Sequence, residues 1–376
     1  MVFFSFLNQR NPNLHVVLAP EAREPETRMM KRTSSPSTRS FDIEATRQAT
    51  KYSSALRALL LTAVVTAALG AGCGEDPTIR QSTGGGGAGG DNTGGGGGMV
   101  VPNDPLPLRV LNWNVHNLEN DKDDSGAPGE TIVSAAEYAA HRKAVGSVIT
   151  LLDPDVAVLQ EVENKAVLDD LNETELGGKY VASSLVDGND YRGVDIAVLS
   201  KFPIDSAVSH KSDAFPLNGT QGPNYYYARD CAEIHISFNG RKMVFLGVHF
   251  KAKSNDDPIQ RLAEAQHTRA IADGLAKEDP SRAIVILGDF NDTPDSPPYL
   301  AVRGDGTTQY VDITQSMPAA NRWTYEFQGK LELIDHQFAS PILAPMLDAA
   351  SVTIRHGADV DDASDHAPVI ATYMVN

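Results

Sequence analysis

The sequence contains little cysteine and little positive charge. Cys73 and Cys231 are the only two cysteines in 376 residues, which excludes a disulfide framework or a cysteine-based zinc site. The formal net charge is −17, from 32 Lys and Arg side chains against 49 Asp and Glu side chains. Residues 1–100 hold 10 basic and 8 acidic side chains, which leaves 22 basic and 41 acidic ones, or −19, for residues 101–376. A region that acidic cannot hold a polyanion by bulk charge, which excludes an architectural nucleic-acid-binding protein.

An apolar run of membrane-spanning length is also lacking. The longest run, Ala58–Ala71, has 14 residues, fewer than the roughly 20 that a span needs but typical of a signal-peptide core. Small residues and Cys73 follow it. The string LGAGC resembles a bacterial lipoprotein signal, although Leu69 lies four residues before the cysteine where that signal has three.

We therefore expect residues 1–73 to be an N-terminal extension with a lipoprotein-type signal peptide. Ordinary secretion and an uncleaved membrane anchor are the alternatives. The protein would then belong to a bacterial cell envelope, lipid-anchored or secreted, and would touch the membrane only through its N-terminal lipid anchor. We expect it to be a monomer.

Glycine is concentrated in one segment. Eleven of the 15 residues from Gly84 to Gly98 are glycine, and such a segment cannot pack a core. Residues 74–103 are therefore predicted to be a flexible linker, and residues 104–376 a single folded domain. The apolar content of 41% is enough to give this domain a sizeable core.

Within that domain, short β-rich runs alternate with helical stretches. Helical spacing of apolar residues predicts helices over 135–152 and 258–277, the first ending at Asp153-Pro154 and the second starting with a proline. Strands are expected over 108–115, 155–162, 194–200, 232–238, 243–250, 283–290, 331–339 and 367–375, with a hairpin turn at Asn239-Gly240. This pattern favours an α/β fold with mixed sheets covered by helices.

Polar residues gather at the ends of these strands, where α/β folds place their sites. They are carboxylates, amides and imidazoles, namely Asn114, Glu161, His249, Asp289, Asn291, Asp335, Asp365 and His366. Each alone is more often a turn or cap residue. Together, oxygen ligands without cysteine suit magnesium, manganese or calcium, and histidines beside carboxylates suit proton transfer.

Six of these segments carry a family resemblance. The strings NWNVHNL, LQEVEN, GVHFKAK, ILGDFND, LELIDHQF and ASDHAPV occur in this order. The ordered set resembles the endonuclease/exonuclease/phosphatase superfamily, with its deoxyribonuclease I-like fold, over essentially all of residues 108–375. The resemblance implies a four-layer α/β/β/α sandwich as the catalytic domain, with the site at one rim. It also implies metal-dependent cleavage of a phosphoester by in-line attack of water.

The resemblance also implies a metal site. By motif position, Glu161 matches the main metal ligand, Asn114 lies beside it, and Asp365 is a further ligand. Mg²⁺ is the cofactor expected, with Mn²⁺ or Ca²⁺ as alternatives.

The same motif positions imply catalytic roles. Asp289 matches the residue that orients or deprotonates the attacking water, and Asn291 the residue that steadies the phosphate. His366, held by Asp335, matches the histidine that contacts the phosphate. His249 matches a second histidine, a candidate acid for the leaving group.

Substrate contacts are harder to predict. Arg229 lies where relatives often carry a phosphate-contacting arginine, with a surface ion pair to Asp230 as the alternative. Lys251 and Arg192 are further candidates for substrate binding.

Three histidines are given no catalytic role. Because neighbours on a strand point to opposite faces, His336 is expected to pack or face solvent when Asp335 faces the site. His116 and His235 are expected to be structural.

Three functions compete for this pattern. The favoured one is a nuclease that cleaves DNA or RNA, and the alternative is a phosphatase or a phosphodiesterase acting on a lipid or small molecule. Residues 333–336 lack the tryptophan and arginine that inositol-phosphatase relatives carry around the aspartate. A non-enzymatic binding module is the third possibility, and the complete polar set argues against it.

Overall fold

The computed structural model describes residues 104–219 and 222–376. The predicted signal peptide (1–73), Cys73 and the linker (74–103) lie outside the described residues. Within the described part, no helix has the length and apolar character needed to cross a bilayer.

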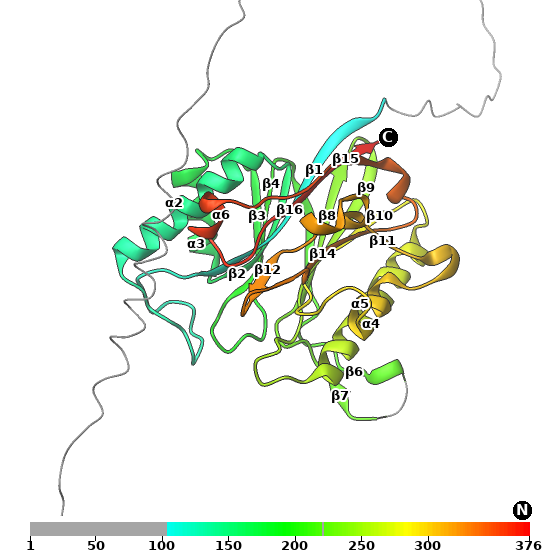
Figure 1. Ribbon diagram of the computed structural model, residues 1–376, viewed down its shortest axis with the longest axis horizontal. Helices are drawn as coiled ribbons and strands as arrows, with labels where there is room; N and C mark the ends of the chain where they lie inside the picture. Colours follow the sequence, from blue (N-terminus) through cyan, green and yellow to red (C-terminus); the bar gives the residue numbers. More distant parts are fainter. Residues whose placement is uncertain (1–103, 220–221) are drawn as a thin grey trace, which may run out of the picture. The chain divides into compact units, whose positions relative to one another are not determined.

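Two six-stranded sheets form the centre of the fold (Figure 1). The first has the order β15 (Leu347–Ile354), β16 (Val369–Val375), β1 (Leu106–Leu118), β2 (Val156–Val162), β4 (Asp195–Ser200) and β3 (Ala182–Val186). The second has the order β11 (Val311–Asp312), β14 (Asp335–Ala339), β10 (Ala283–Asp289), β9 (Arg241–His249), β8 (Cys231–Phe238) and β5 (Ile204–Ser209). The pairs β1–β2 and β9–β10 are parallel, so each sheet brings two carboxyl strand ends to one edge.

Helices cover the outer face of each sheet (Figure 1). α2 (Ala135–Leu152) and α3 (Lys165–Asp170) pack on the first sheet, and α4 (Pro258–Glu278) and α5 (Pro297–Arg303) on the second. Ser134 and Glu137 form a capping box at the start of α2, and Asp257 caps α4 before Pro258. The short helix α6 (Ala358–Asp361) precedes the last strand.

Three apolar clusters hold these layers together. The first lies between the two sheets and includes Val158 and Phe245. Leu111 and Ile149 belong to the cluster under α2, and Ile284 to the one under α4. Strand residues that alternate between two buried faces explain why the central strands read as continuous apolar runs. The predicted four-layer α/β/β/α sandwich is thus confirmed.

Most predicted elements are present with small shifts at their ends. The hairpin β8–β9 turns at Asn239 and Gly240, whose φ angles of 48° and 80° are the positive values that this two-residue turn requires. The helix predicted over 135–152 has those bounds, and Asp153 ends it in the left-handed conformation.

The prediction of a single strand over 331–339 is wrong. It is broken at Leu333-Ile334 into β13 (Lys330–Glu332), which pairs with β12 (Tyr325–Phe327), and β14, which joins the second large sheet. The Thr324 hydroxyl accepts hydrogen bonds from the backbone N–H groups of Ile334 and Asp335, each 3.1 Å long, and so takes them out of strand pairing. A small two-stranded sheet, β6 (Phe215–Pro216) and β7 (Asn224–Tyr225), was not predicted.

Candidate active site

The carboxyl ends of the parallel strand pairs surround a cavity of about 690 Å³. Nine of the eleven predicted site residues line it: Asn114, Glu161, Arg192, Arg229, His249, Asp289, Asn291, Asp365 and His366. Asp335 is fully buried behind the wall. Lys251 is not in the lining.

Local backbone irregularities aim several of these side chains. The pairing of β1 with β2 shifts register between Asn114 and Leu118, and the pairing of β2 with β4 shifts between Gln160 and Val162. Glu161 has φ 65° and Asn291 has φ 53°, values that non-glycine residues seldom adopt. Bulges of this kind re-aim side chains next to active sites, which fits their place at this cavity.

Gly288 lets β9 and β10 approach closely just before Asp289. Its φ is 151°, and a Cβ there would lie 1.8 Å from the carbonyl oxygen of Val248. Only glycine therefore fits at this position, and the close approach sets Asp289 directly opposite His249 in the strand register.

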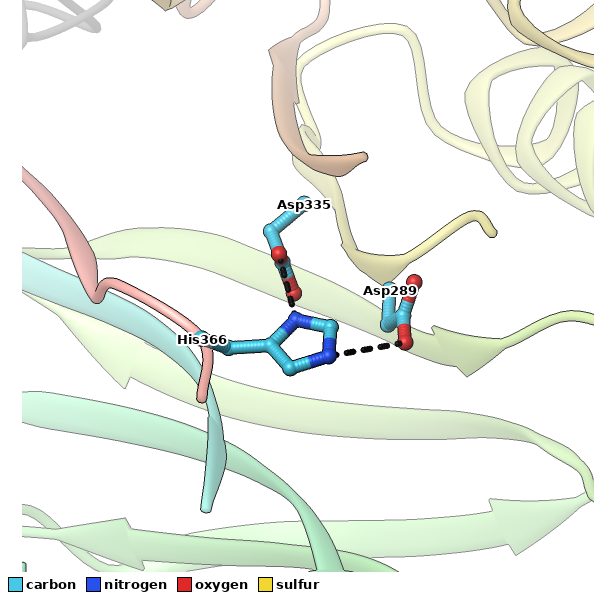
Figure 2. Close-up of side chains that lie close together, drawn as sticks. All are labelled: Asp289, Asp335 and His366. Atoms are coloured by element: carbon cyan, nitrogen blue, oxygen red, sulfur yellow. Dashed lines mark hydrogen bonds and ion pairs between the residues drawn. The ribbon is translucent and has the colours of Figure 1, made fainter. Parts of the chain in front are cut away.

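A carboxylate–histidine–carboxylate line places His366, from the loop before β16 of the first sheet, between two aspartates of the second sheet (Figure 2). His366 Nδ1 lies 2.8 Å from Asp335 Oδ2, and His366 Nε2 lies 4.0 Å from Asp289 Oδ2. Burial acts against a charge on His366, but the carboxylates of Asp335, Asp289 and Asp365 outweigh it and raise the His366 pKa to about 10. His366 is therefore cationic at neutral pH, and Asp335 fixes its ring orientation.

Asp289 is held from several sides. Its Oδ1 accepts a hydrogen bond of 2.8 Å from the backbone N–H of Asn291, and its Oδ2 accepts one of 3.2 Å from Asn114 Nδ2. Burial, and then the charge of Asp335, raise the pKa of Asp289 to about 7. A carboxylate with that pKa can accept a proton near neutral pH.

His249 is buried beside the same carboxylate. Its Nε2 lies 3.5 Å from Asp289 Oδ2 and 3.9 Å from Glu161 Oε1. Burial, followed by the charges of Arg229 and Arg192, lowers the pKa of His249 well below its ordinary value. The ring is therefore neutral at pH 7, which fits donation of a hydrogen bond better than the predicted donation of a proton.

Two arginines form one end of the cavity around a residue that the sequence did not reveal. Asp190 Oδ2 accepts hydrogen bonds from Arg192 Nη2 at 2.9 Å and from Arg229 Nε at 2.7 Å. Burial acts against its ionisation, but the two guanidinium groups lower the Asp190 pKa to about 2. The proposed alternative pairing of Arg229 with Asp230 is absent from the ion pairs of the described residues. Arg192 also reaches Glu161 Oε1 at 3.2 Å.

The positions of one lysine and one histidine differ from those expected from the sequence. Lys253, not Lys251, lines the cavity, while the Lys251 ammonium donates to the Ser254 carbonyl oxygen at 3.3 Å. His116 was expected to be structural, but its half-exposed side chain lines the cavity 3.4 Å from Asp365 Oδ1. Its strand-end position after Asn114 is the signal that could have included it.

The other two structural assignments agree with their surroundings. His336 is fully buried against Phe290 and Tyr299, and its Nε2 lies 2.9 Å from the Asp292 carbonyl oxygen. His235 pairs with Glu233 on β8.

The cavity also contains residues for which the sequence offered no signal. Tyr325 on β12 packs its ring 4.9 Å from the His366 ring. Phe327 at the end of the same strand is 53% exposed and lines the cavity. Both come from the hairpin that the broken strand created.

The oxygen donors of the cavity fit a divalent metal. Glu161, Asp365 and the Asn114 amide line the cavity together with Asp289, and Mg²⁺ is commonly bound through one or two carboxylates while it keeps several waters. Among the described residues, two groups of acidic or histidine side chains place ligand atoms within 4.8 Å of one another: Asp289, Asp335 and His366, and Asp124, Glu130 and Glu163. The predicted ligands Glu161 and Asp365 belong to neither group.

A comparison with models of protein families identifies the family of this chain. A family model described as "Endonuclease/Exonuclease/phosphatase family" matches residues 111–366. The chain belongs to this family. Members of the endonuclease/exonuclease/phosphatase family are hydrolases that act on phosphoester bonds, and they use divalent metals. No curated protein matches the sequence.

Solved structures of the same family share the fold. A family protein from Bacteroides thetaiotaomicron has 19% sequence identity and a TM-score of 0.52, over 72% of this chain and 96% of that one. Truncated Caenorhabditis elegans TDP2 has 16% identity and a TM-score of 0.50, over 72% and 98%. The human nocturnin catalytic domain, solved with a bound sulfate anion, has 13% identity and a TM-score of 0.50, over 72% and 95%.

Proposed function

We propose that this protein is a divalent-metal-dependent phosphodiesterase of the bacterial cell envelope, and that it cleaves DNA or RNA by in-line attack of water. The observation that carries the proposal is the line Asp335–His366–Asp289, assembled from both sheets beside a cavity with carboxylate and guanidinium walls. An isolated structural histidine would not need a second carboxylate on the far side of its ring.

The charges around the cavity support a requirement for metal. Six carboxylates lie in or directly behind its wall: Glu161, Asp190, Asp289, Glu332, Asp335 and Asp365. Four cationic side chains face them: Arg192, Arg229, Lys253 and His366. An anionic phosphodiester therefore meets excess negative charge, which a divalent cation would offset.

We assign the metal to Glu161, Asn114 and Asp365, with Mg²⁺ as the expected ion and Mn²⁺ or Ca²⁺ as alternatives. When bound, such an ion polarises the phosphoryl oxygen. The lipid anchor at Cys73 remains part of the proposal, and so does a monomeric state.

The other side chains of the cavity have separate roles in proton transfer and in binding the phosphate. Asp289, with its pKa of about 7, accepts the proton of the attacking water, and the Asn291 amide steadies the phosphate. The cationic His366 supplies positive charge and a proton for the leaving oxygen, while the neutral His249 donates an N–H to a phosphate oxygen. Arg192 and Arg229, held by Asp190, orient the substrate phosphates.

The substrate class is tested by a panel of phosphoesters. Plasmid DNA, single-stranded RNA, bis-p-nitrophenyl phosphate, p-nitrophenyl phosphate, inositol phosphates and sphingomyelin are incubated with the purified protein, with Mg²⁺ or with EDTA. We expect cleavage of the nucleic acids and of the diester in Mg²⁺ only, and none by His366→Ala. Full activity in EDTA would contradict the metal requirement. Preference for the monoester, inositol phosphates or sphingomyelin would replace the nuclease assignment with the alternative phosphatase or lipid phosphodiesterase.

A further inference from the structure

A second acidic cluster lies outside the cavity just described. Asp124 and Glu130 come from the loop between β1 and α2, and Glu163 follows β2. One ligand atom of each lies within 4.8 Å of the other two. The cluster has no nitrogen or sulfur ligand, so its donors suit a hard cation.

Hydrogen bonds hold one oxygen of each carboxylate in place. Glu163 Oε2 accepts from the backbone N–H of Asn120 at 2.6 Å. Glu130 Oε1 accepts from the backbone N–H groups of Asp124 and Ser125, both at 2.9 Å. Asp124 Oδ1 accepts from Asn120 Nδ2 at 3.1 Å and from Asn164 Nδ2 at 2.6 Å. Each of the three side chains is thus oriented through donors to one oxygen and keeps a second oxygen.

Two of those second oxygens are buried without a donor. Glu163 is only 1% exposed, and neither its Oε1 nor Glu130 Oε2 has a hydrogen-bond partner. A buried carboxylate oxygen without a partner loses its hydration unless a proton or a cation replaces the water. The cluster therefore has room for a cation, or for a proton, between these two oxygens.

We propose that Asp124, Glu130 and Glu163 bind a second divalent cation, separate from the active-site metal. Ca²⁺ fits this site best, because it accepts irregular oxygen cages from loops, whereas Mg²⁺ demands near-octahedral geometry. A cavity of about 560 Å³ whose wall includes Asp124 and Glu163 gives the ion access to solvent and room for water ligands.

The position of the cluster gives this cation a role. The loop that carries Asp124 and Glu130 packs on the turn that carries Arg192. Gly129 donates its backbone N–H to the Tyr191 carbonyl oxygen at 3.0 Å, and a Cβ on Gly193 would lie 2.6 Å from both Ala127 Cβ and Ser125 Oγ. A cation that orders the loop would also hold the turn, and with it the Arg192 side chain, in place.

Thermal unfolding in CaCl₂ tests this site without reference to activity. The full chain is stripped with EDTA, dialysed, and unfolded with Ca²⁺, with Mg²⁺ or with neither. Ca²⁺ at a hundredfold excess over its Kd should raise the Tm by roughly 5–10 °C. Glu163→Gln and Asp124→Asn should lose the part of that shift that this site contributes. Asp123→Asn, which changes an exposed acidic residue of the same loop outside the cluster, should keep it.

Glu161→Gln separates this site from the active site. It should lose hydrolysis and the part of the Ca²⁺ shift that the active site contributes, while Glu163→Gln should lose the rest of the shift and one of two binding events in a calorimetric Ca²⁺ titration. Loss of the whole shift in Glu161→Gln and of none of it in Glu163→Gln would overturn the proposal. A wild-type Tm that does not change with Ca²⁺ would also overturn it, since a proton shared by Glu130 and Glu163 would then take the place of the cation. If Glu163→Gln does not fold, Asp124→Asn decides alone. Failure of the substrate panel leaves these outcomes unaffected.

Discussion

The charge on His366 depends most on one buried neighbour. Asp335 Oδ2 lies 2.8 Å from His366 Nδ1 and is the strongest of the carboxylates that raise the His366 pKa to about 10. A neutral partner at the same place would keep the packing and remove the charge. The pair can therefore be tested by a change of one atom in the side chain.

We expect Asp335→Asn to lower kcat by about 10²–10⁴-fold. Without the Asp335 charge the His366 pKa falls, so the alkaline limb of the kcat–pH profile should move down from about 10. The profile is measured with bis-p-nitrophenyl phosphate in saturating Mg²⁺. Asp305→Asn, which changes an exposed residue outside the cavity, is the control and should leave the pH profile unchanged. An unmoved alkaline limb in Asp335→Asn would mean that His366 does not act as a cation.

The pKa of Asp289 predicts the acid side of the same profile. Burial and the Asp335 charge raise this pKa to about 7, and a carboxyl group acts as a base only when it is ionised. We therefore expect kcat/KM to rise tenfold per pH unit below about 7 and to level off above it. Asp289→Asn should remove most of the activity and this limb together. A rate that is flat between pH 5 and pH 8 in the wild-type protein would exclude Asp289 as the base.

At the scale of elements, the sequence predicted what burial and turn chemistry determine. The central strands are apolar on both faces, and the β8–β9 turn has its Asn239-Gly240 pair, so both were expected close to their observed bounds. β5 and β15 were missed because they are largely exposed and carry short polar side chains. The break at Leu333-Ile334 was missed because it depends on the distant Thr324 hydroxyl.

The candidate site was predictable where a residue ends a buried strand. Asp289 and His366 belong to that class, whereas Asp190 lies in a loop and is identified only by its contacts with Arg192 and Arg229. The sequence does not show which lysine of the string HFKAK lines the cavity, because nothing in it reveals how the chain leaves β9 and returns to the cavity.

A row of histidines and carboxylates ties α4 to the second sheet and makes stability depend on pH. His210 Nδ1 lies 2.8 Å from Asp213 Oδ2, and His210 Nε2 lies 3.1 Å from Glu233 Oε2 on β8. His267 of α4 contacts Asp213 at 2.9 Å, and His235 contacts Glu233 at 2.5 Å. Burial acts against the charge on His210, but Glu233 and Asp213 raise its pKa above the ordinary value of 6.5.

The sign of the pH effect follows from this raised pKa. The stability that His210 contributes is fully present below its unfolded pKa of about 6.5 and is lost as the pH rises through the higher folded value. His210→Asn should therefore cost about 1–2 kcal/mol at pH 6 and much less at pH 9. Both pH values lie above the range in which Asp213 and Glu233 titrate, because their pKa values are lowered.

Urea unfolding of wild-type and His210→Asn protein at the two pH values measures the difference. His356→Asn, which changes a histidine bonded to a backbone carbonyl oxygen and stacked on Trp323, is the control. A cost for His210→Asn that is equal at pH 6 and pH 9 would show that packing, not charge, accounts for it.

At the scale of the whole molecule, the site exists only while the two sheets keep their alignment. Asn114 and His366 come from the first sheet and its flanking loop, and Asp289 and Asp335 come from the second, so the hydrogen bonds of the site cross the interface. Apolar side chains make up most of the interface between the sheets, and apolar packing alone specifies alignment weakly.

Asn112 is a polar group that links the two sheets directly beneath the site. From β1 its Nδ2 donates to the carbonyl oxygens of Gly288, at 3.3 Å, and His336, at 3.2 Å, both on the second sheet. Its Oδ1 accepts from Gln160 Nε2 on β2 at 3.0 Å. The two carbonyl groups flank Asp289 and Asp335 in the chain, so a shift of the sheets at Asn112 becomes a shift of the catalytic carboxylates.

Replacement of Asn112 by alanine should therefore affect stability and catalysis together. Loss of three buried hydrogen bonds should lower the free energy of unfolding by about 2–4 kcal/mol, and kcat should fall by at least about tenfold through misalignment. Asn172→Ala is the matched control, since that buried asparagine bonds only to the Tyr180 backbone within one side of the sandwich. It should lose comparable stability and keep kcat. If Asn112→Ala also kept kcat while losing stability, the alignment of the sheets would be set by apolar packing, and Asn112 would serve only to satisfy buried carbonyl groups.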